Sequence, residues 1–243
     1  MNKAYRATGR VLRGAIRRAI LPFMGTITGV STDEKIAALT FDDGPNPEAT
    51  PALLEILNRH GAKATFFMVG RSAERYPDIV RKVAESGHSI GVHSWDHPSF
   101  PSICGSERRR QITACERALH PYGDKLFRPP FGHQSVASRM DFLRRGYKVI
   151  AWNVHAFDWE IHDSRWTAER LSRDLRPGGI ILLHDALFHA MHRGAEDRTP
   201  VLAALDAFLE GAGDFSFVTV PDLLRAGRPD MKNWFVRDHD DWG

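Results

Sequence analysis

The sequence has little of what marks several classes of protein. Only two of its 243 residues are cysteines, Cys104 and Cys115, and they stand in no metal-binding or redox spacing, so a small disulfide scaffold is excluded. No apolar run reaches the roughly 18–20 residues that a membrane-spanning helix needs. No linker, repeat or low-complexity stretch divides the chain. With 42% hydrophobic and 26% charged residues, the composition is that of an ordinary folded protein with a sizeable core.

Acidic residues are missing from the beginning of the chain. The formal net charge is +3, yet six basic residues precede the first acid, Asp33. These six residues carry a charge of +6, so the rest of the chain carries a net charge of −3. The basic excess therefore belongs to the N-terminal segment, and the body shows no basic patch. This distribution argues against a nucleic-acid partner.

Residues 11–20 of that segment have the spacing of an amphipathic helix. Apolar residues recur at i, i+1, i+4 and i+5 and face a basic side. Three interpretations fit: a helix packed or loosely held against the body, a helix in peripheral contact with anionic lipid, and a signal peptide. Pro22 interrupts the apolar stretch and no small-residue cleavage site follows. The first interpretation is favoured, with a cytoplasmic or membrane-associated location, and export is the alternative.

Apolar segments typical of buried strands alternate with helical segments along the rest of the chain. We expect strands at 35–41, 64–69, 89–92, 126–127, 147–153, 180–183 and 215–218. We expect helices at 50–59, 73–85, 106–119, 135–145, 167–175, 199–209 and 221–224. This alternation predicts one α/β domain with six or seven parallel strands, either a barrel or an open sheet. In both architectures, functional residues gather at the carboxyl ends of the strands.

Two of these strand ends carry residues suited to a metal site. Asp42 and Asp43 follow the first expected strand within an Asp-Asp-Gly-Pro turn. Adjacent carboxylates repel each other, and a bound cation compensates them, with one carboxylate as ligand and the other as base. His93 and His97 follow the third strand, and their i, i+4 spacing lets both reach one ion. Two imidazoles and one carboxylate leave an open position, as in catalytic zinc sites.

Three further strand ends also carry chemically useful residues. Arg128 opens the rigid turn Arg-Pro-Pro-Phe-Gly, where its permanent charge can hold a carboxylate in place. Asp158 and Trp159 follow the fifth strand, and His184 ends the apolar sixth strand. Charged or metal-binding residues at five of the seven expected strand ends favour a functional site over a set of unrelated loop residues.

These five loops together resemble the polysaccharide deacetylase family, also called the NodB-homology domain or carbohydrate esterase family 4. The resemblance covers about residues 35–225, with the motifs in the family's order. The matching segments are 40–44, 93–97, 128–132, 158–159 and 182–184. The resemblance implies a distorted (β/α) TIM-like barrel and metal-dependent removal of N-acetyl or O-acetyl groups from an acetylated glycan.

The resemblance also implies a role for each matching residue. Asp43, His93 and His97 would bind the metal, with Zn²⁺ expected first and Co²⁺ or another divalent ion as alternatives. Asp42 would be the general base, held in place by Arg128. His184 would be the general acid, paired with Asp158. Trp159 and Leu182 would line a pocket for the acetyl methyl group, and the backbone amide of Phe131 would help hold the oxyanion.

Two positions depart from the family's usual pattern. His155 stands where an aspartate is common, and Phe131 stands where a tyrosine is common. We expect activity to survive both, because Asp158 is retained and the role at Phe131 belongs to the backbone. Specificity should lie in loops 99–106, 157–166 and 186–198, where His162, His189 and His192 are expected to be solvated rather than to face the groove.

The domain implied by the resemblance spans 31–228, between the basic segment 1–30 and a tail, 229–243. Chitooligosaccharide, peptidoglycan and other glycans that contain N-acetylglucosamine are candidate substrates. Two alternatives remain at this point. One is a deformylase or amidase of the same superfamily acting on a lipid-linked sugar, and the other is a sugar-binding relative with a decayed site.

Overall fold

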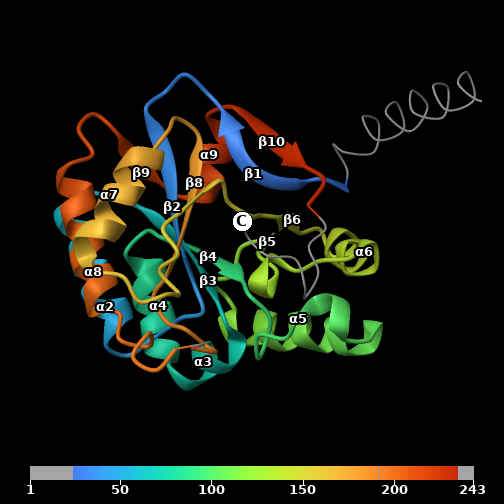
Figure 1. Cartoon of the computed structure of the whole chain (residues 1–243). Coiled ribbons are helices and arrows are strands. Elements are labelled where there is room, and N and C mark those ends of the chain that lie inside the picture. The colour runs from blue at the N-terminus through green and yellow to red at the C-terminus, as the bar shows by residue number, and fades with distance from the viewer. Residues whose placement is uncertain (1–23, 191, 235–243) are drawn as a thin grey trace, which may run out of the picture.

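The strands of the protein form one curled sheet in a computed structural model that describes residues 24–190 and 192–234 (Figure 1). The helix expected at 11–20 lies outside these residues. The strands are β1 (Thr26–Ser31), β2 (Ile36–Asp42), β3 (Ala64–Met68), β4 (Ser89–Val92), β5 (Leu126–Phe127), β6 (Lys148–Val149), β7 (Val154–His155), β8 (Gly179–His184), β9 (Ser216–Val218) and β10 (Arg228–Lys232). Their order across the sheet is β10-β1-β8-β2-β3-β4-β5-β6, with β7 paired to β8 and β9 paired to β2.

The two sides of this sheet meet, which makes it a distorted barrel. Strand β1 runs antiparallel to β8 and β10, whereas the pairs from β8 through β6 are parallel. An isolated bridge joins Ile27 of β1 to Ile150, just after β6. The amide of Ala151 also donates to the carbonyl of Ile27 at 2.7 Å. The barrel implied by the resemblance is confirmed, and the open sheet is not observed.

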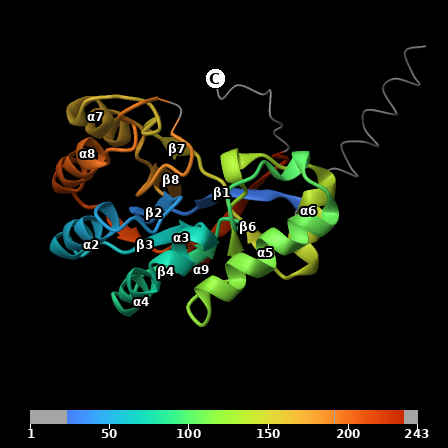
Figure 2. The same ribbon diagram turned by 90° about the horizontal axis from the view of Figure 1, so that it is seen from below.

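Helices cover the outside of the barrel. They are α2 (Ala49–Arg59), α3 (Gly70–Arg75), α4 (Pro77–Glu85), α5 (Gly105–Leu119), α6 (Val136–Arg144), α7 (Ser164–Asp174), α8 (Thr199–Glu210) and α9 (Val220–Arg225). Figures 1 and 2 show α2, α7 and α8 along one flank of the barrel and α5 and α6 along the opposite flank. Within the described ranges, no helix is both long enough and apolar enough to cross a membrane. Both cysteines are free.

The alternation of side chains along each strand separates the core from the site. In β2, Leu39 and Phe41 belong to the large apolar cluster that includes the helices. Successive side chains of a strand point to opposite faces, so Thr40 and Asp42 point the other way, into the barrel. The neighbouring strand β8 repeats the pattern, with Leu183 in the same cluster and Leu182 in a second, smaller one.

Several elements differ from the expectations. The helix expected at 73–85 is the end of α3 followed by α4, because Pro77 has no N–H to continue the first helix. The strand expected at 147–153 is reduced to β6, and β7 follows it as a separate strand. Strands β1 and β10 were not expected. The boundaries expected after residues 30 and 228 fall inside these two paired strands, so the sheet includes residues on both sides of each boundary.

Gly178 allows the close contact between β1 and the start of β8. Its amide donates to the carbonyl of Ile36, its carbonyl accepts from the amide of Val30, and its φ is +70°. A Cβ at this position would lie 1.7 Å from the Val30 oxygen. Gly61 has a similar φ of +62° but has no atom within 4 Å of such a Cβ, which makes it a matched control.

We predict that Gly178→Ala destabilises the protein more than Gly61→Ala. The positive φ alone should cost either variant about 1–2 kcal/mol. The clash at Gly178 should add about 1–3 kcal/mol. Urea unfolding followed by circular dichroism measures both. Equal losses in the two variants would show that β1 does not depend on this contact.

Candidate active site

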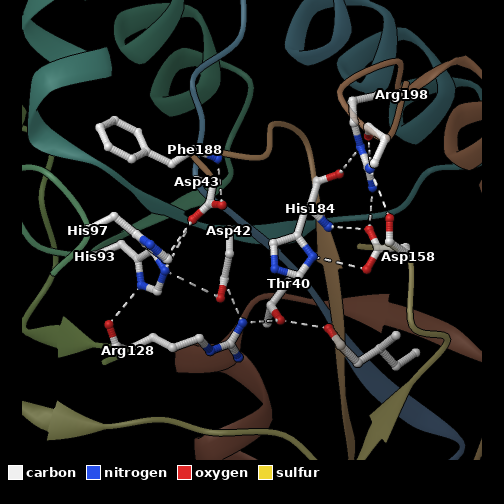
Figure 3. Close-up of polar contacts among 12 residues, drawn as sticks. Thr40, Asp42, Asp43, His93, His97, Arg128, Asp158, His184, Phe188 and Arg198 are labelled. Atoms are coloured by element: carbon white, nitrogen blue, oxygen red, sulfur yellow. Dashed lines mark hydrogen bonds and ion pairs between the residues drawn. The ribbon is translucent and has the colours of Figure 1, made fainter. Parts of the chain in front are cut away.

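The catalytic candidates Asp42 and His184 are brought together by the register of two parallel strands. Asp42 ends β2, His184 ends β8, and the two are register partners. Both strands point their carboxyl ends toward the same opening. Figure 3 shows the rings of His93 and His97 on one side of Asp42 and the ring of His184 on the other.

Arg128 lies beneath Asp42 and is fully buried. Its Nη1 donates to Asp42 Oδ1 and to Thr40 Oγ1, each at 2.7 Å (Figure 3), and its Nη2 donates to the carbonyl of Ala151 at 3.1 Å. Burial lowers the pKa of Arg128, and the charge of Asp42 opposes that effect. The ion pair occupies Oδ1 of Asp42, while Oδ2 lies 3.8 Å from His93 Nε2. Arg128 therefore fixes this carboxylate in one orientation.

The backbone of Arg128 also orients His93. The Nδ1 atom of His93 lies 2.7 Å from the Arg128 carbonyl oxygen, which can only accept, so Nδ1 carries the proton and Nε2 presents a lone pair. That Nε2 lies 3.3 Å from Asp43 Oδ1, and His97 Nε2 lies 3.2 Å from the same oxygen. Possible ligand atoms of Asp43, His93 and His97 all lie within 4.8 Å of one another, and all three residues are buried.

The polar atoms of this cluster fit a divalent cation. Asp43 Oδ1 is buried and lacks a hydrogen-bond partner among the described residues, while Oδ2 accepts from the amide of Phe188 at 2.9 Å. Burial alone would raise the pKa of Asp43, but His97 and His93 hold it well below the usual value. Burial lowers the pKa of His97. An ionised carboxylate and neutral imidazoles are the forms that bind metal.

The loops of the site have an unusual backbone. Five non-glycine residues with positive φ occur in the described chain, and all lie in the loops at this end of the barrel: Asp43, Ser94, His97, Phe131 and Phe157. Such conformations cost on the order of 1–3 kcal/mol each and persist only where the surroundings enforce them. Two of the five belong to the cluster that can hold a metal. The local backbone is thus shaped to aim these side chains rather than to minimise its own energy.

A second buried ion pair holds His184. Asp158 Oδ1 lies 2.9 Å from His184 Nδ1, and its Oδ2 accepts from the His184 amide at 2.8 Å (Figure 3). Arg198 donates to the same Oδ2 at 2.5 Å. Burial alone would lower the pKa of His184, but the charge and hydrogen bond of Asp158 outweigh it and raise the pKa. Burial would raise the pKa of Asp158, and the charges of His184 and Arg198 lower it.

The cavity above these groups contains most of the residues that the sequence predicted. It is lined by Asp42, Asp43, His93, His97 and His184, together with Phe131, Trp159 and Leu182. Arg128 and Asp158 lie behind this lining and hold Asp42 and His184. The structure therefore brings all ten predicted residues to one site.

Other residues of the site were not assigned by sequence reasoning. Trp152, Leu187 and His189 also line the cavity, so the expectation that His189 is only a solvated residue is wrong. Arg198, Thr40 and the amide of Phe188 support the charged groups. Arg198 directly precedes the helix expected at 199–209, which could have marked it. Nothing in the sequence marks a backbone amide such as that of Phe188.

Comparison with known proteins places this chain in a family. Residues 29–150 match the polysaccharide deacetylase family model. A chitooligosaccharide deacetylase of Azorhizobium caulinodans is 37% identical over 166 residues, which are 67% of this chain and 79% of that protein. A peptidoglycan-N-acetylglucosamine deacetylase of Bacillus cereus is 32% identical over 216 residues, which are 86% of this chain and 98% of that protein.

A solved structure agrees with these sequence relatives. It is a crystal structure of a peptidoglycan N-acetylglucosamine deacetylase in complex with 4-naphthalen-1-yl-N-oxidanyl-benzamide. It is 28% identical, has a TM-score of 0.77, and covers 87% of this chain and 98% of its own. The chain belongs to the polysaccharide deacetylase family and is a hydrolase of carbon–nitrogen bonds other than peptide bonds.

We predict that Asp158→Asn lowers the pKa of His184. The negative charge of Asp158 stabilises the imidazolium form of His184, and the substitution removes that charge. Histidine-selective NMR titration of metal-free protein measures this pKa. Asp206→Asn is the control, since Asp206 forms a similar pair with His60, 2.7 Å apart, outside the cavity. It should leave the His184 titration unchanged. An unaltered His184 pKa in a folded Asp158→Asn variant would contradict the assignment.

Proposed function

We propose that the protein is a metal-dependent deacetylase that hydrolyses N-acetyl groups of a glycan containing N-acetylglucosamine, such as chitooligosaccharide or peptidoglycan, and releases acetate. One observation carries this proposal: the Asp43, His93 and His97 cluster opens into the same cavity as Asp42 and His184. The names of the relatives support the substrate class. Two imidazoles and one carboxylate favour Zn²⁺, with Co²⁺ or another divalent ion as alternatives.

Asp42 acts as the general base. When bound, the divalent ion lowers the pKa of a coordinated water and stabilises negative charge on the acetyl carbonyl oxygen. Asp42 accepts the proton of the attacking water at Oδ2, since Oδ1 is taken by Arg128. Its fixed orientation removes the entropic cost of finding the water.

His184 acts as the general acid on the opposite side of the substrate. Its Nδ1 is held by Asp158, which leaves Nε2 to deliver a proton to the departing amine nitrogen. The raised pKa keeps the imidazolium form populated at higher pH than for an ordinary histidine. A carboxylate base and a cationic acid, held by separate ion pairs, supply both proton transfers that amide hydrolysis requires.

The apolar part of the cavity selects the acyl group. Trp159 and Leu182 line it, with Trp152 beside them. These side chains contact a methyl group favourably and offer no partner for a polar substituent. The backbone amide of Phe131, whose φ is +56°, would donate to the oxyanion. An acetyl group fits this lining better than a formyl group, which has no methyl to bury, so the deformylase alternative is less favoured.

The charged groups also argue against a decayed site. The three cluster residues, the base, the acid and both arginines are present, and each charge is paired or fits a cation. A sugar-binding relative without catalysis would have no need to keep buried charges, which are costly to desolvate.

We predict that His93→Ala loses both metal and activity, because Nε2 of His93 is one of only three protein ligands. Metal content after zinc loading and desalting, measured by mass spectrometry, tests this. His120→Ala, at an exposed histidine beyond α5, is the control and should retain both. Full zinc content in His93→Ala would remove His93 from the ligand set.

We predict that Asp42→Asn retains metal but releases acetate on the order of 10²–10⁴-fold more slowly, as expected for loss of a general base. The assay measures acetate and formate release from N-acetylglucosamine oligomers and from peptidoglycan with added Zn²⁺ or Co²⁺. Wild-type protein should release acetate in preference to formate. Formate as the main product would favour the deformylase, and near-normal turnover by Asp42→Asn would identify another base.

A further inference from the structure

Aromatic rings lead out of the catalytic cavity along the segment between β7 and α7. Trp159 and His184 both line the cavity, and their ring centroids lie 5.8 Å apart. The next ring, Phe157, is 5.3 Å from Trp159. The imidazole of His155 stacks on Trp159 at 5.7 Å, with 16° between the ring planes. The rings thus begin at the acid of the proposed reaction and continue away from it.

The series continues from Phe157 onto helix α7. The guanidinium carbon of Arg170 lies 4.6 Å from the Phe157 ring and 5.8 Å from the Trp166 ring. Trp166 in turn stacks on His162 at 3.7 Å, with 23° between the planes. We call these five residues the aromatic track: Trp159, Phe157, Arg170, Trp166 and His162. None of the five is fully buried, and Trp166 is 37% exposed.

Local hydrogen bonds fix the track. The side chain of Asp163 caps α7 by accepting from the amide of Trp166 at 2.8 Å. Arg170 donates from Nε to the backbone carbonyl of His155 at 3.3 Å, which anchors the cation between the two rings. An exposed ring that is already fixed loses little conformational entropy when it binds a ligand. Large exposed rings and arginine are also the residue types most often responsible for binding energy.

We propose that the aromatic track is an extended subsite for the glycan chain, which holds the sugar units beyond the one being deacetylated. This inference rests on the proposed function. A pyranose ring has an apolar face of C–H groups and a polar rim of hydroxyls. Its apolar face packs on an aromatic ring, while its hydroxyls reach acceptors at the edge. Glu160 and Asp163 are exposed beside the track and offer carboxylate oxygens for this purpose.

The same surroundings disfavour a lipid surface as the occupant. Glu160, Asp163 and Glu169 are all exposed around the track, and their negative charges would be repelled by anionic headgroups. The track also alternates apolar rings with the polar side chains of His162 and Arg170. It is continuous with the catalytic cavity through Trp159, as a chain that passes from the reaction centre onto the surface requires.

Chain-length dependence of deacetylation tests this proposal. The measurement is kcat/KM for acetate release from the hexamer and the dimer of N-acetylglucosamine, in wild-type protein and in Trp166→Ala. In Trp166→Ala, the ratio of kcat/KM for the hexamer to kcat/KM for the dimer should fall on the order of tenfold, because only the longer chain reaches Trp166. Ile161→Ala is the matched control, since Ile161 is 64% exposed in the same loop but has no aromatic ring. It should keep the wild-type ratio.

Further variants and a binding assay separate the possible failures. Trp166→Phe retains a ring and should restore most of the ratio, which a purely structural role of the loop would not explain. If wild-type protein releases no acetate from either oligomer, the proposed function fails for this substrate, and tryptophan fluorescence then measures hexamer binding directly. Weaker binding by Trp166→Ala still supports the track.

Two outcomes would overturn the proposal. The first is the same hexamer-to-dimer ratio of kcat/KM in Trp166→Ala as in wild-type protein. Where no acetate is released, the corresponding result is that the hexamer does not bind, or that it binds equally to Trp166→Ala and Ile161→Ala. The second is sedimentation with phosphatidylglycerol vesicles that depends on Trp166 while the chain-length ratio does not, which would make the rings a lipid contact.

Discussion

The burial of the Arg128 charge is the constraint on which the site depends. A guanidinium without solvent is costly unless it is paired with an opposite charge and hydrogen-bonded. Here the Asp42 carboxylate, the Thr40 hydroxyl and the Ala151 carbonyl accept its hydrogen bonds, and the rings of Phe67 and Trp152 lie near its faces. Its own carbonyl fixes the proton on His93. One residue therefore orients both the proposed base and a member of the cluster that can hold a metal, so these two parts of the site cannot shift independently.

A second buried arginine supports the proposed acid, His184. Arg198 and His184 share the carboxylate of Asp158, whereas Arg128 forms the ion pair with Asp42. Each ion pair fixes one of the two proposed proton-transfer groups. The two groups are thus held by separate partners. Asp158 contributes the largest favourable interaction to the raised pKa of His184, and the charges of Asp43 and Asp42 add smaller ones.

The sequence was sufficient to predict which strand ends carry the site, and the reason is geometric. Parallel strands deliver their carboxyl ends to one face, so Asp42, His93 and His184 meet whatever the details of the barrel. Strands β1 and β10 escaped prediction because their partners lie about 200 residues apart in the chain. His189 escaped because a loop between β8 and α8 determines where its ring lies, and loop paths are not encoded in hydrophobic periodicity. The need for glycine at position 44 could not be predicted for the same reason. It arises from the close approach of Asp185, whose Oδ2 would lie 2.2 Å from a Cβ at Gly44.

The energetic contrast between the two parts of the site bears on how its specificity can change. The charged groups are buried and mutually compensated, so removing one partner leaves an unpaired charge at a cost of about 3–5 kcal/mol. The segment from Phe157 to Trp166 is partly exposed, and its contacts are ring stacking and one helix cap. Substitutions there cost far less, since exposed positions away from buried networks usually change stability by about 0.5 kcal/mol or less. Under the proposed function, the barrel interior holds the chemistry constant, and the choice of glycan is left to a surface that can vary without disturbing it.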